Sequence, residues 1–211
     1  MKRLSKTFYL GSYIGTIIPL SILQLVVYVG YFKYTDFRGL IHGFSYTDEF
    51  EIPWWSTLSS TLVTPIMIYF AVVLCMFIYN SWASIQDRHA RTSPCRALGF
   101  LFIPFFNLYW IFQAIWGFAV DFNKYVIRNK VGTAPRLPQR WFLAPCILYL
   151  LSFILGSIIA LLGYGPYAYA GWAVSTAYYI IGAILINKVC DAVNALPSNT
   201  KLNLGVAQRN C

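Results

Sequence analysis

The chain has 211 residues, of which 58% are hydrophobic and 18% aromatic, whereas only 11% are charged. An ordinary soluble domain carries about 25% charged residues, so this composition, with a mean hydropathy of +0.58, excludes such a domain and indicates an integral membrane protein. The formal net charge of +9 is what basic loops beside membrane spans produce, and it does not imply nucleic-acid binding.

Five apolar stretches follow one another along the chain, at residues 9–32, 58–80, 97–119, 142–162 and 168–189. Each is close to the ~20 residues that a helix needs to cross the hydrocarbon core. The first stretch follows the basic start MKRLSK, but it is too long for a signal peptide and no small-residue cleavage site follows it. We therefore interpret it as an uncleaved anchor.

The stretches leave little sequence for a globular domain. The sequence therefore predicts an all-α, polytopic membrane bundle in which residues 1–194 form a single transmembrane helical domain. Residues 195–211 are polar and contain proline and several asparagines, so we expect them to form a flexible cytoplasmic tail.

The distribution of positive charge bears on the third apolar stretch. If all five stretches cross with the N-terminus inside, the 16 Lys and Arg residues divide into six inside and ten outside, which is opposite to the positive-inside rule. If residues 97–119 enter and leave through the same face, only Lys33 and Arg38 of the 16 lie outside. The charges therefore favour four spans and one re-entrant segment in a bacterial inner membrane, with both termini cytoplasmic. A Pro-kinked fifth span is the alternative.

The third stretch contains residues that can break a helix. Pro104 has no amide hydrogen and interrupts helical hydrogen bonding, and Asn107 has a side chain that can bond the backbone groups thus freed. Non-helical backbone at membrane depth is tolerated only where protein covers it or where it lines a water-filled cavity. We therefore expect the other helices to enclose this bend.

A polar stripe follows the bend. Its members recur at spacings of three and four residues, which predicts a helix with one polar face. They are Gln113, Gly117, Asp121, Lys124 and Arg128. Because Asp121 lies at the predicted membrane edge close to Lys124, we expect a solvated helix end there and not a buried ion site.

Two smaller features complete the structural expectations. Gly11 and Gly15 form a GxxxG pair, a pattern typical of close contacts between membrane helices. Neither predicted outer loop contains a cysteine, and the five cysteines lie in spans or on the basic side. Because that side is expected to be reducing, we predict five unpaired thiols.

The sequence contains no recognisable catalytic or metal-binding constellation. The two histidines, His42 and His89, are predicted on opposite sides of the membrane, no glutamate lies in a span, and there is no HExxH motif. No recognisable sequence pattern places a general base beside a Ser or Cys nucleophile. We therefore expect a protein that is not an enzyme and that needs no cofactor or metal.

A basic stretch immediately precedes the third apolar stretch and contains Asp87, Arg88, His89, Arg91 and Arg96. Such stretches are typical of cytoplasmic loops that anchor membrane topology. They can also bind the anionic headgroups of membrane lipids or an acidic cytoplasmic partner. Membrane lipids are therefore expected partners at the basic loops.

One part of the chain resembles a known group of proteins. Residues 84–123 are similar to a segment of uncharacterised bacterial multi-span membrane proteins, in which Arg-Thr-x-Pro leads into a GFLFIPFFNLYW-like core that ends in an acidic-x-Asn pair. The matching positions are Arg91, Thr92, Pro94, Gly99, Pro104, Phe105, Asn107, Tyr109, Trp110, Asp121 and Asn123.

The resemblance covers about a fifth of the chain, and residues 190–197 are also similar to the end of such proteins. Cys95 stands where the group is expected to have glycine. Because these proteins are of unknown function, the resemblance implies a membrane location and no activity.

The leading functional hypothesis is a non-catalytic membrane component that assembles with, or regulates, a partner complex or a second copy of itself. The candidate residues for partner or lipid binding come from the basic stretch, the bend and the helix after it. They are Asp87, Arg88, His89, Arg91, Arg96, Pro104, Asn107, Tyr109, Trp110, Gln113, Asp121 and Asn123.

Two alternatives make different structural predictions. A small transporter or channel-like protein would have a wet cavity lined by Asn107, Gln113 and Asn187, since broken helices near the midplane build such sites. A lipid-modifying enzyme would need the charged stretch to converge with Asp121 and Asn123 at the inner interface.

Overall fold

The computed structural model describes residues 3–42, 54–87, 89–162 and 167–197. Within these ranges the chain is helical and contains no strand. Four helices are long, namely α1 (Lys6–His42), α2 (Trp54–Ser84), α6 (Gln139–Leu162) and α7 (Tyr167–Asn194). Each contains a segment long and apolar enough to cross a membrane. The protein is therefore an all-α integral membrane protein with four candidate spans.

The long helices pack side by side as neighbours in the order α2, α1, α7 and α6. Their outer faces expose aliphatic side chains such as Ile18 on α1, Ile68 on α2 and Ile154 on α6. α2 and α6 are apolar on all sides, which is typical of helices surrounded by lipid or by other membrane segments. The position of α2 and α6 in the membrane is determined by their apolar surface and not by their intrinsic helix propensity.

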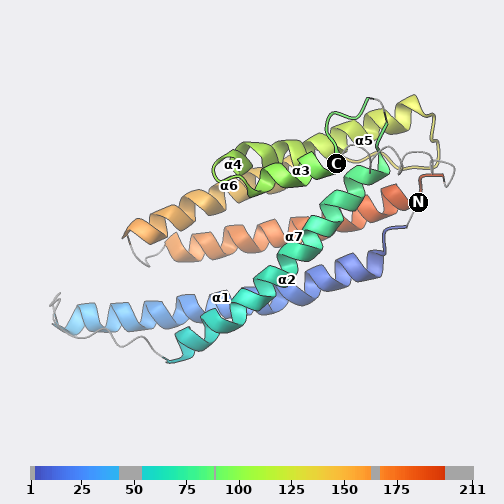
Figure 1. The fold of residues 1–211 in the computed structure, drawn as a ribbon. Coiled ribbons are helices and arrows are strands. Elements are labelled where there is room, and N and C mark those ends of the chain that lie inside the picture. The colour runs from blue at the N-terminus through green and yellow to red at the C-terminus, as the bar shows by residue number, and fades with distance from the viewer. Residues whose placement is uncertain (1–2, 43–53, 88, 163–166, 198–211) are drawn as a thin grey trace.

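The third apolar stretch does not form one long helix. It begins as α3 (Pro94–Gly99), tightens into the 3₁₀ turn η1 (Phe100–Phe102), and breaks before α4 (Phe106–Ile111). The π-helical turn η2 (Phe112–Trp116) and α5 (Gly117–Arg128) follow. We call residues 94–128 the hairpin. Within it, α3 packs against α2 and against η2, and η2 packs against α6. Figure 1 shows that the chain reverses direction at α4.

The hairpin begins and ends at the same end of the bundle, where α1 and α6 begin and α2 and α7 end (Figure 1). Contacts between distant segments fix this arrangement. Leu4 N–H donates to Asn194 Oδ1 and Asn194 Nδ2 donates to Leu4 O, both at 2.9 Å. Thr133 Oγ1 donates to Ala195 O at 3.1 Å.

We call this end the basic end, because the segments that meet there carry ten described Lys and Arg residues. They are Arg3, Lys6, Arg91, Arg96, Lys124, Arg128, Lys130, Arg136, Arg140 and Lys188. Lys33 and Arg38 lie on the opposite part of α1. The described chain ends at Pro197, with Leu196 buried, and the rest of the predicted tail lies outside the described residues.

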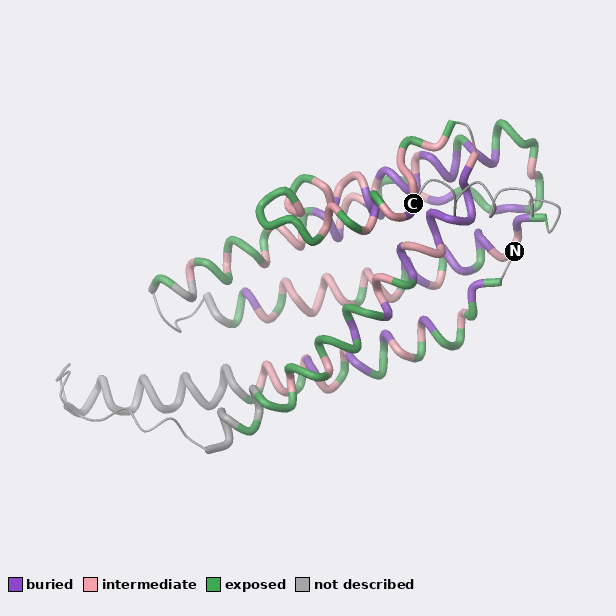
Figure 2. The backbone as a smooth tube through the Cα atoms, in the orientation of Figure 1, coloured by how far each residue is buried: buried purple, intermediate pink, exposed green. Residues whose placement is uncertain are grey.

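Among the residues whose burial is described, the buried ones gather toward the basic end (Figure 2). The buried cluster joins Trp82 of α2, Phe118 and Phe122 of α5, and Val189 of α7. The hairpin thus supplies part of the main hydrophobic core through α5. The expectation that the other helices enclose the bend is wrong, because Phe102 and Phe105 at the bend are exposed.

Two smaller expectations from the sequence are wrong. A Cβ added at Gly11 or Gly15 would meet nothing within 4 Å, so neither glycine marks a close helix contact. The close contact lies instead at Gly182 of α7, where a Cβ would stand 1.9 Å from the Tyr13 hydroxyl of α1. Cys95 is disulfide-bonded, so it is not one of the unpaired thiols that the sequence predicted.

Candidate functional site

The hairpin reverses at a strained turn centred on Phe105. Phe106 N–H donates to Pro104 O at 2.7 Å, and Phe105 has φ 62° and ψ −39°. This is a γ-turn with positive φ, a rare and strained conformation that glycine tolerates better than phenylalanine. Asn107 N–H then donates to Ile103 O at 3.0 Å, and α4 begins. The break thus falls at Pro104, as the sequence predicts.

Asn107 has a different partner from the one expected. Its side-chain Nδ2 donates to Tyr149 Oη at 3.4 Å, while the turn itself satisfies the nearby backbone. Tyr149 is ten residues beyond Gln139, where α6 begins, which corresponds to about 15 Å along a helix. The reversal therefore lies beside the middle of a span, about half of the ~30 Å hydrocarbon thickness.

The hairpin exposes an aromatic tip, which we define as Phe102, Ile103, Phe105, Phe106 and Tyr109. Phe102 is 69% exposed, Phe105 80% and Tyr109 58%. Side chains of this kind usually contribute to cores or interfaces, since each buries a large apolar area. Here they face outward from the chain at the depth of the bend.

Trp110 holds the two arms of the hairpin together behind the aromatic tip. Its ring centroid lies 4.7 Å from that of Phe100, edge to face, and its Nε1–H donates to Ala97 O at 3.1 Å. The Trp110 ring also stacks on Phe106, with centroids 5.6 Å apart. Trp110 is therefore a structural residue of the hairpin, whereas its neighbour Tyr109 points outward.

The π turn η2 attaches the hairpin to the spans on either side. Gly117 N–H donates to Phe112 O, five residues back, so the helix is widened here. Trp82 Nε1–H of α2 donates to Ala114 O at 3.0 Å, and Cys146 Sγ of α6 lies 3.7 Å from Ile111 O. Such widened turns occur frequently at functional sites.

A chain of hydrogen bonds runs along the outer side of the hairpin, and we call its members Tyr109, Gln113, Arg91 and Asp121 the polar ladder. Arg91 Nη2 lies 3.2 Å from Asp121 Oδ1, and the Arg91 backbone N–H donates to Asp121 Oδ2 at 3.2 Å. Arg91 Nη1 donates to Gln113 Oε1 at 3.2 Å. Gln113 Nε2 donates to Tyr109 Oη at 3.3 Å.

The surroundings of Asp121 differ from those that the sequence predicts. Asp121 is only 7% exposed and ion-paired, whereas a solvated helix end was expected. Four members of the predicted stripe, Gln113, Gly117, Asp121 and Arg128, meet the loop before α3, whereas Lys124 is exposed. A Cβ at Gly117 would stand 3.3 Å from Gln113 Oε1, so glycine leaves room for the ladder.

A second ion pair lies beside the ladder. Arg128 Nη2 pairs with Asp87 Oδ2, and Asp87 Oδ1 accepts the backbone N–H of His89 at 2.9 Å. Arg88 lies outside the described residues. Arg96 has an exposed side chain at the start of α3, where its backbone N–H donates to Ser93 Oγ at 3.3 Å. Asp87 and Arg128 thus tie the loop after α2 to the end of α5.

Asn123 does not join the polar ladder. Its Nδ2 donates to Leu137 O and its Oδ1 accepts the Leu137 backbone N–H, both at 2.8 Å. This buried pair of bonds ties the connector before α6 to α5. The charged stretch therefore converges with Asp121 but not with Asn123, so the condition for the enzyme alternative is only half met.

Sequence reasoning missed the residues that attach the hairpin to the spans, namely Trp82, Cys146 and Tyr149. Nothing in the sequence relates Trp82 to a carbonyl 32 residues later. Cys146 and Tyr149 lie inside the fourth apolar stretch, whereas Trp82 lies just after the second, so the three share no sequence signal.

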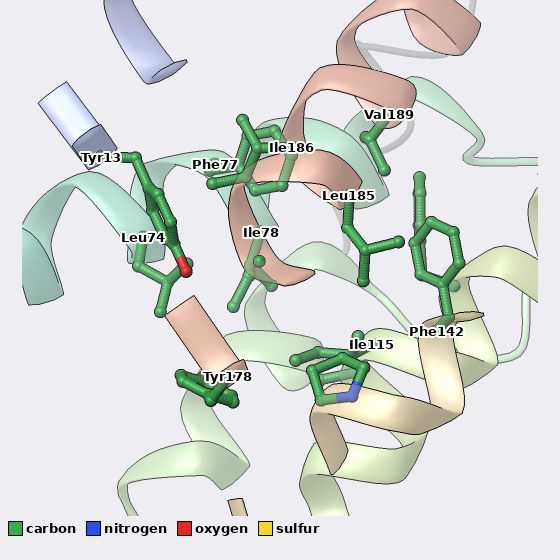
Figure 3. Close-up of a pocket in the computed structure, with 14 residues that line it drawn as sticks. Tyr13, Leu74, Phe77, Ile78, Ile115, Phe142, Tyr178, Leu185, Ile186 and Val189 are labelled. Atoms are coloured by element: carbon green, nitrogen blue, oxygen red, sulfur yellow. The ribbon is translucent and has the colours of Figure 1, made fainter. Parts of the chain in front are cut away.

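A cavity of about 70 Å³ lies inside the bundle, with walls from all four long helices and from the hairpin (Figure 3). Its lining is almost entirely apolar and includes Tyr13, Ile78, Phe118, Tyr178 and Leu185. Asn107, Gln113 and Asn187 are not among the lining residues. This cavity is therefore not the wet pathway that the transporter alternative predicts.

Comparisons of the chain with protein-family models, with curated proteins and with solved structures find no match. Among the described residues, no group of three or more His, Cys, Asp or Glu side chains is placed to hold a metal ion.

Proposed function

We propose that the protein is a non-catalytic accessory or regulatory subunit of a membrane complex, and that the aromatic tip of the hairpin binds a membrane helix of its partner. The observation that carries the proposal is Phe105, which combines a positive φ with an 80% exposed ring. Holding a non-glycine residue in this region costs about 1–3 kcal/mol, and such strain clusters at functional positions. Glycine would make the turn without that cost, but it would present no ring.

The position of the aromatic tip supports a protein partner. It lies beside Tyr149, well inside α6, where a second membrane helix could reach it. Aromatic side chains bury large areas in interfaces and cluster among the residues that dominate binding energy. Trp110 stacks on Phe106 and so holds one ring of the tip in place, which reduces the conformational freedom lost on binding.

The proposal includes a topology. The hairpin is re-entrant, entering and leaving through one leaflet, and the basic end faces the cytoplasm of a bacterial cell, with both termini on that side. The ten cations of the basic end support this orientation. The disulfide at Cys95 argues instead for an oxidising compartment at this end. Labelling from each side of the membrane distinguishes a cytoplasmic basic end from one that faces an oxidising compartment.

We propose a non-catalytic protein because of the contacts that the Asp121 carboxylate makes. Both of its carboxylate oxygens interact with Arg91, one with the guanidinium and one with the backbone N–H. A general base must lie within hydrogen-bonding reach of its substrate, and Asp121 is only 7% exposed. Asp121 is therefore better suited to hold Arg91 in place than to take up a proton.

The test is affinity purification of the full chain in mild detergent, followed by mass spectrometry, with matched variants. We expect Phe102→Ala and Phe105→Gly to lose a stoichiometric partner that the unmodified chain retains. Phe153→Ala is the control, because Phe153 is also exposed but lies on the outer face of α6. Purification of the unmodified chain as a monomer without another protein would contradict the proposal, as would equal loss in the control.

A further inference from the structure

The outer side of the hairpin differs from the rest of the exposed membrane surface. Elsewhere the long helices expose mostly apolar side chains such as Ile18, Ile68 and Ile154, which lipid tails cover without cost, although Tyr69 of α2 is also 47% exposed. The polar ladder instead exposes Tyr109, and 41% of the Arg91 side chain is also accessible. Polar groups at membrane depth need a hydrogen-bonding partner, because lipid tails offer none.

The depth of the ladder identifies the membrane region that it faces. Ala114, next to Gln113, is hydrogen-bonded to Trp82, two residues before α2 ends at Ser84. Gln113 therefore lies near the boundary between hydrocarbon and headgroups, where Trp side chains are enriched. Tyr109 lies one helical turn deeper and Asp121 two turns nearer the basic end. The ladder thus spans the depth of a phospholipid phosphate, its ester groups and the start of its acyl chains.

The ladder retains hydrogen-bond donors for a ligand. A guanidinium has five N–H groups, and Arg91 uses Nη1 for Gln113 and Nη2 for Asp121. The Gln113 amide has a second hydrogen besides the one directed at Tyr109. Asp121 holds the guanidinium in place and Gly117 leaves the space beside it open, so the donors are fixed before any ligand arrives.

Charge at the basic end favours an anion. The ten described cations there are accompanied by only three carboxylates, those of Asp87, Asp121 and Asp191. All three are ion-paired, which leaves an excess of positive charge around the ladder. Phosphate oxygens match the planar donor array of arginine.

We propose that the polar ladder is a binding site for one anionic phospholipid of the leaflet that the hairpin enters. The phosphate lies on the Arg91 guanidinium, an ester carbonyl accepts from Gln113, and the acyl chain lies along the Tyr109 ring. This site shares only Tyr109 with the aromatic tip, and its phosphate-binding groups on Arg91 and Gln113 do not depend on the partner proposed there.

The test is native mass spectrometry of the full chain in detergent with phosphatidylglycerol or phosphatidylcholine added. We expect the chain to retain phosphatidylglycerol at least about tenfold better than phosphatidylcholine. The double variant Arg91→Gln/Asp121→Asn loses this preference, and because it removes both charges it leaves no unpaired buried charge. Arg128→Gln/Asp87→Asn keeps the preference. It makes the same chemical change in the ion pair outside the ladder.

Arg91→Lys provides a second variant that keeps Asp121 neutralised. Lysine retains the charge but lacks the planar fork, so we expect phosphatidylglycerol binding to weaken about tenfold. Equal retention of the two lipids by the unmodified chain would overturn the proposal, and so would equal loss of preference in the two double variants. Displacement of phosphatidylglycerol by millimolar glycerol phosphate would also overturn it, because the site would then recognise a free phosphate and not a lipid.

Discussion

At the residue scale, Asp121 and Gly182 show how single positions hold the hairpin and the helices in place. Asp121 is a buried carboxylate whose ion pair with Arg91 closes the base of the hairpin. At Gly182, the absence of a side chain allows the Tyr13 side chain of α1 to pack against α7. Each of the two residues controls a contact between elements far apart in the chain.

Removal of Arg91 alone should lower the free energy of unfolding more than removal of the whole ion pair. Arg91→Ala leaves the buried Asp121 carboxylate without its cation, which we expect to cost about 2–3 kcal/mol, below the value for a fully buried pair because Arg91 is partly exposed. Arg91→Gln/Asp121→Asn should recover most of this loss. Unfolding in detergent measures the free-energy difference, and equal stability of the two variants would contradict the ion-pair argument.

Gly182→Ala should destabilise the contact between α1 and α7 by about 1–3 kcal/mol, because the new Cβ overlaps the Tyr13 hydroxyl. Tyr13→Phe in the same chain should recover part of the loss by removing the oxygen. Gly156→Ala is the matched control on α6, since a Cβ there meets nothing within 4 Å. Thermal unfolding measures all three, and equal effects at the two glycines would be inconsistent with this packing.

At the element scale, the hairpin combines a strained reversal with firm attachment. The γ-turn at Phe105 is strained, while the π turn is tied to α2 by Trp82 and Asn107 is tied to α6 by Tyr149. These attachments hold the hairpin in position despite the strain. An element of this kind can present a fixed aromatic surface to a neighbour in the membrane.

The strain at Phe105 predicts a difference between two substitutions that both remove the ring. Phe105→Gly relieves the positive φ, whereas Phe105→Ala keeps it. We expect the glycine variant to be about 1 kcal/mol more stable than the alanine variant, the reverse of the usual order for these residues. Chemical unfolding in the same detergent compares them, and a more stable alanine variant would show that the turn is not strained.

At the scale of the whole molecule, the buried residues among those whose burial is described gather at the basic end (Figure 2). The polar contacts of the hairpin base lie at the same end, where Asn194 also joins α7 to the residues before α1. This uneven distribution of packing makes the basic end the rigid part of the fold, since local stability follows buried contacts.

The sequence predicts the four spans and the break at Pro104 correctly, because apolar length and a missing amide hydrogen are local properties. It predicts that Gln113, Gly117 and Asp121 share a helix face, but not what that face meets. The pairing of Asp121 with Arg91 joins residues 30 positions apart. Such pairings depend on how the hairpin folds back, which spacing along one helix does not specify.

The most direct test of the account is side-specific labelling of single cysteines with a membrane-impermeant thiol reagent, in a chain whose native cysteines are replaced. His89 precedes the hairpin, Gly132 follows it with open space at its Cβ, and Leu161 is 83% exposed near the end of α6. The account predicts that cysteines at His89 and Gly132 react from the cytoplasmic side and that a cysteine at Leu161 reacts from the other. Reaction at His89 and Gly132 from opposite sides would contradict the hairpin's return through one leaflet.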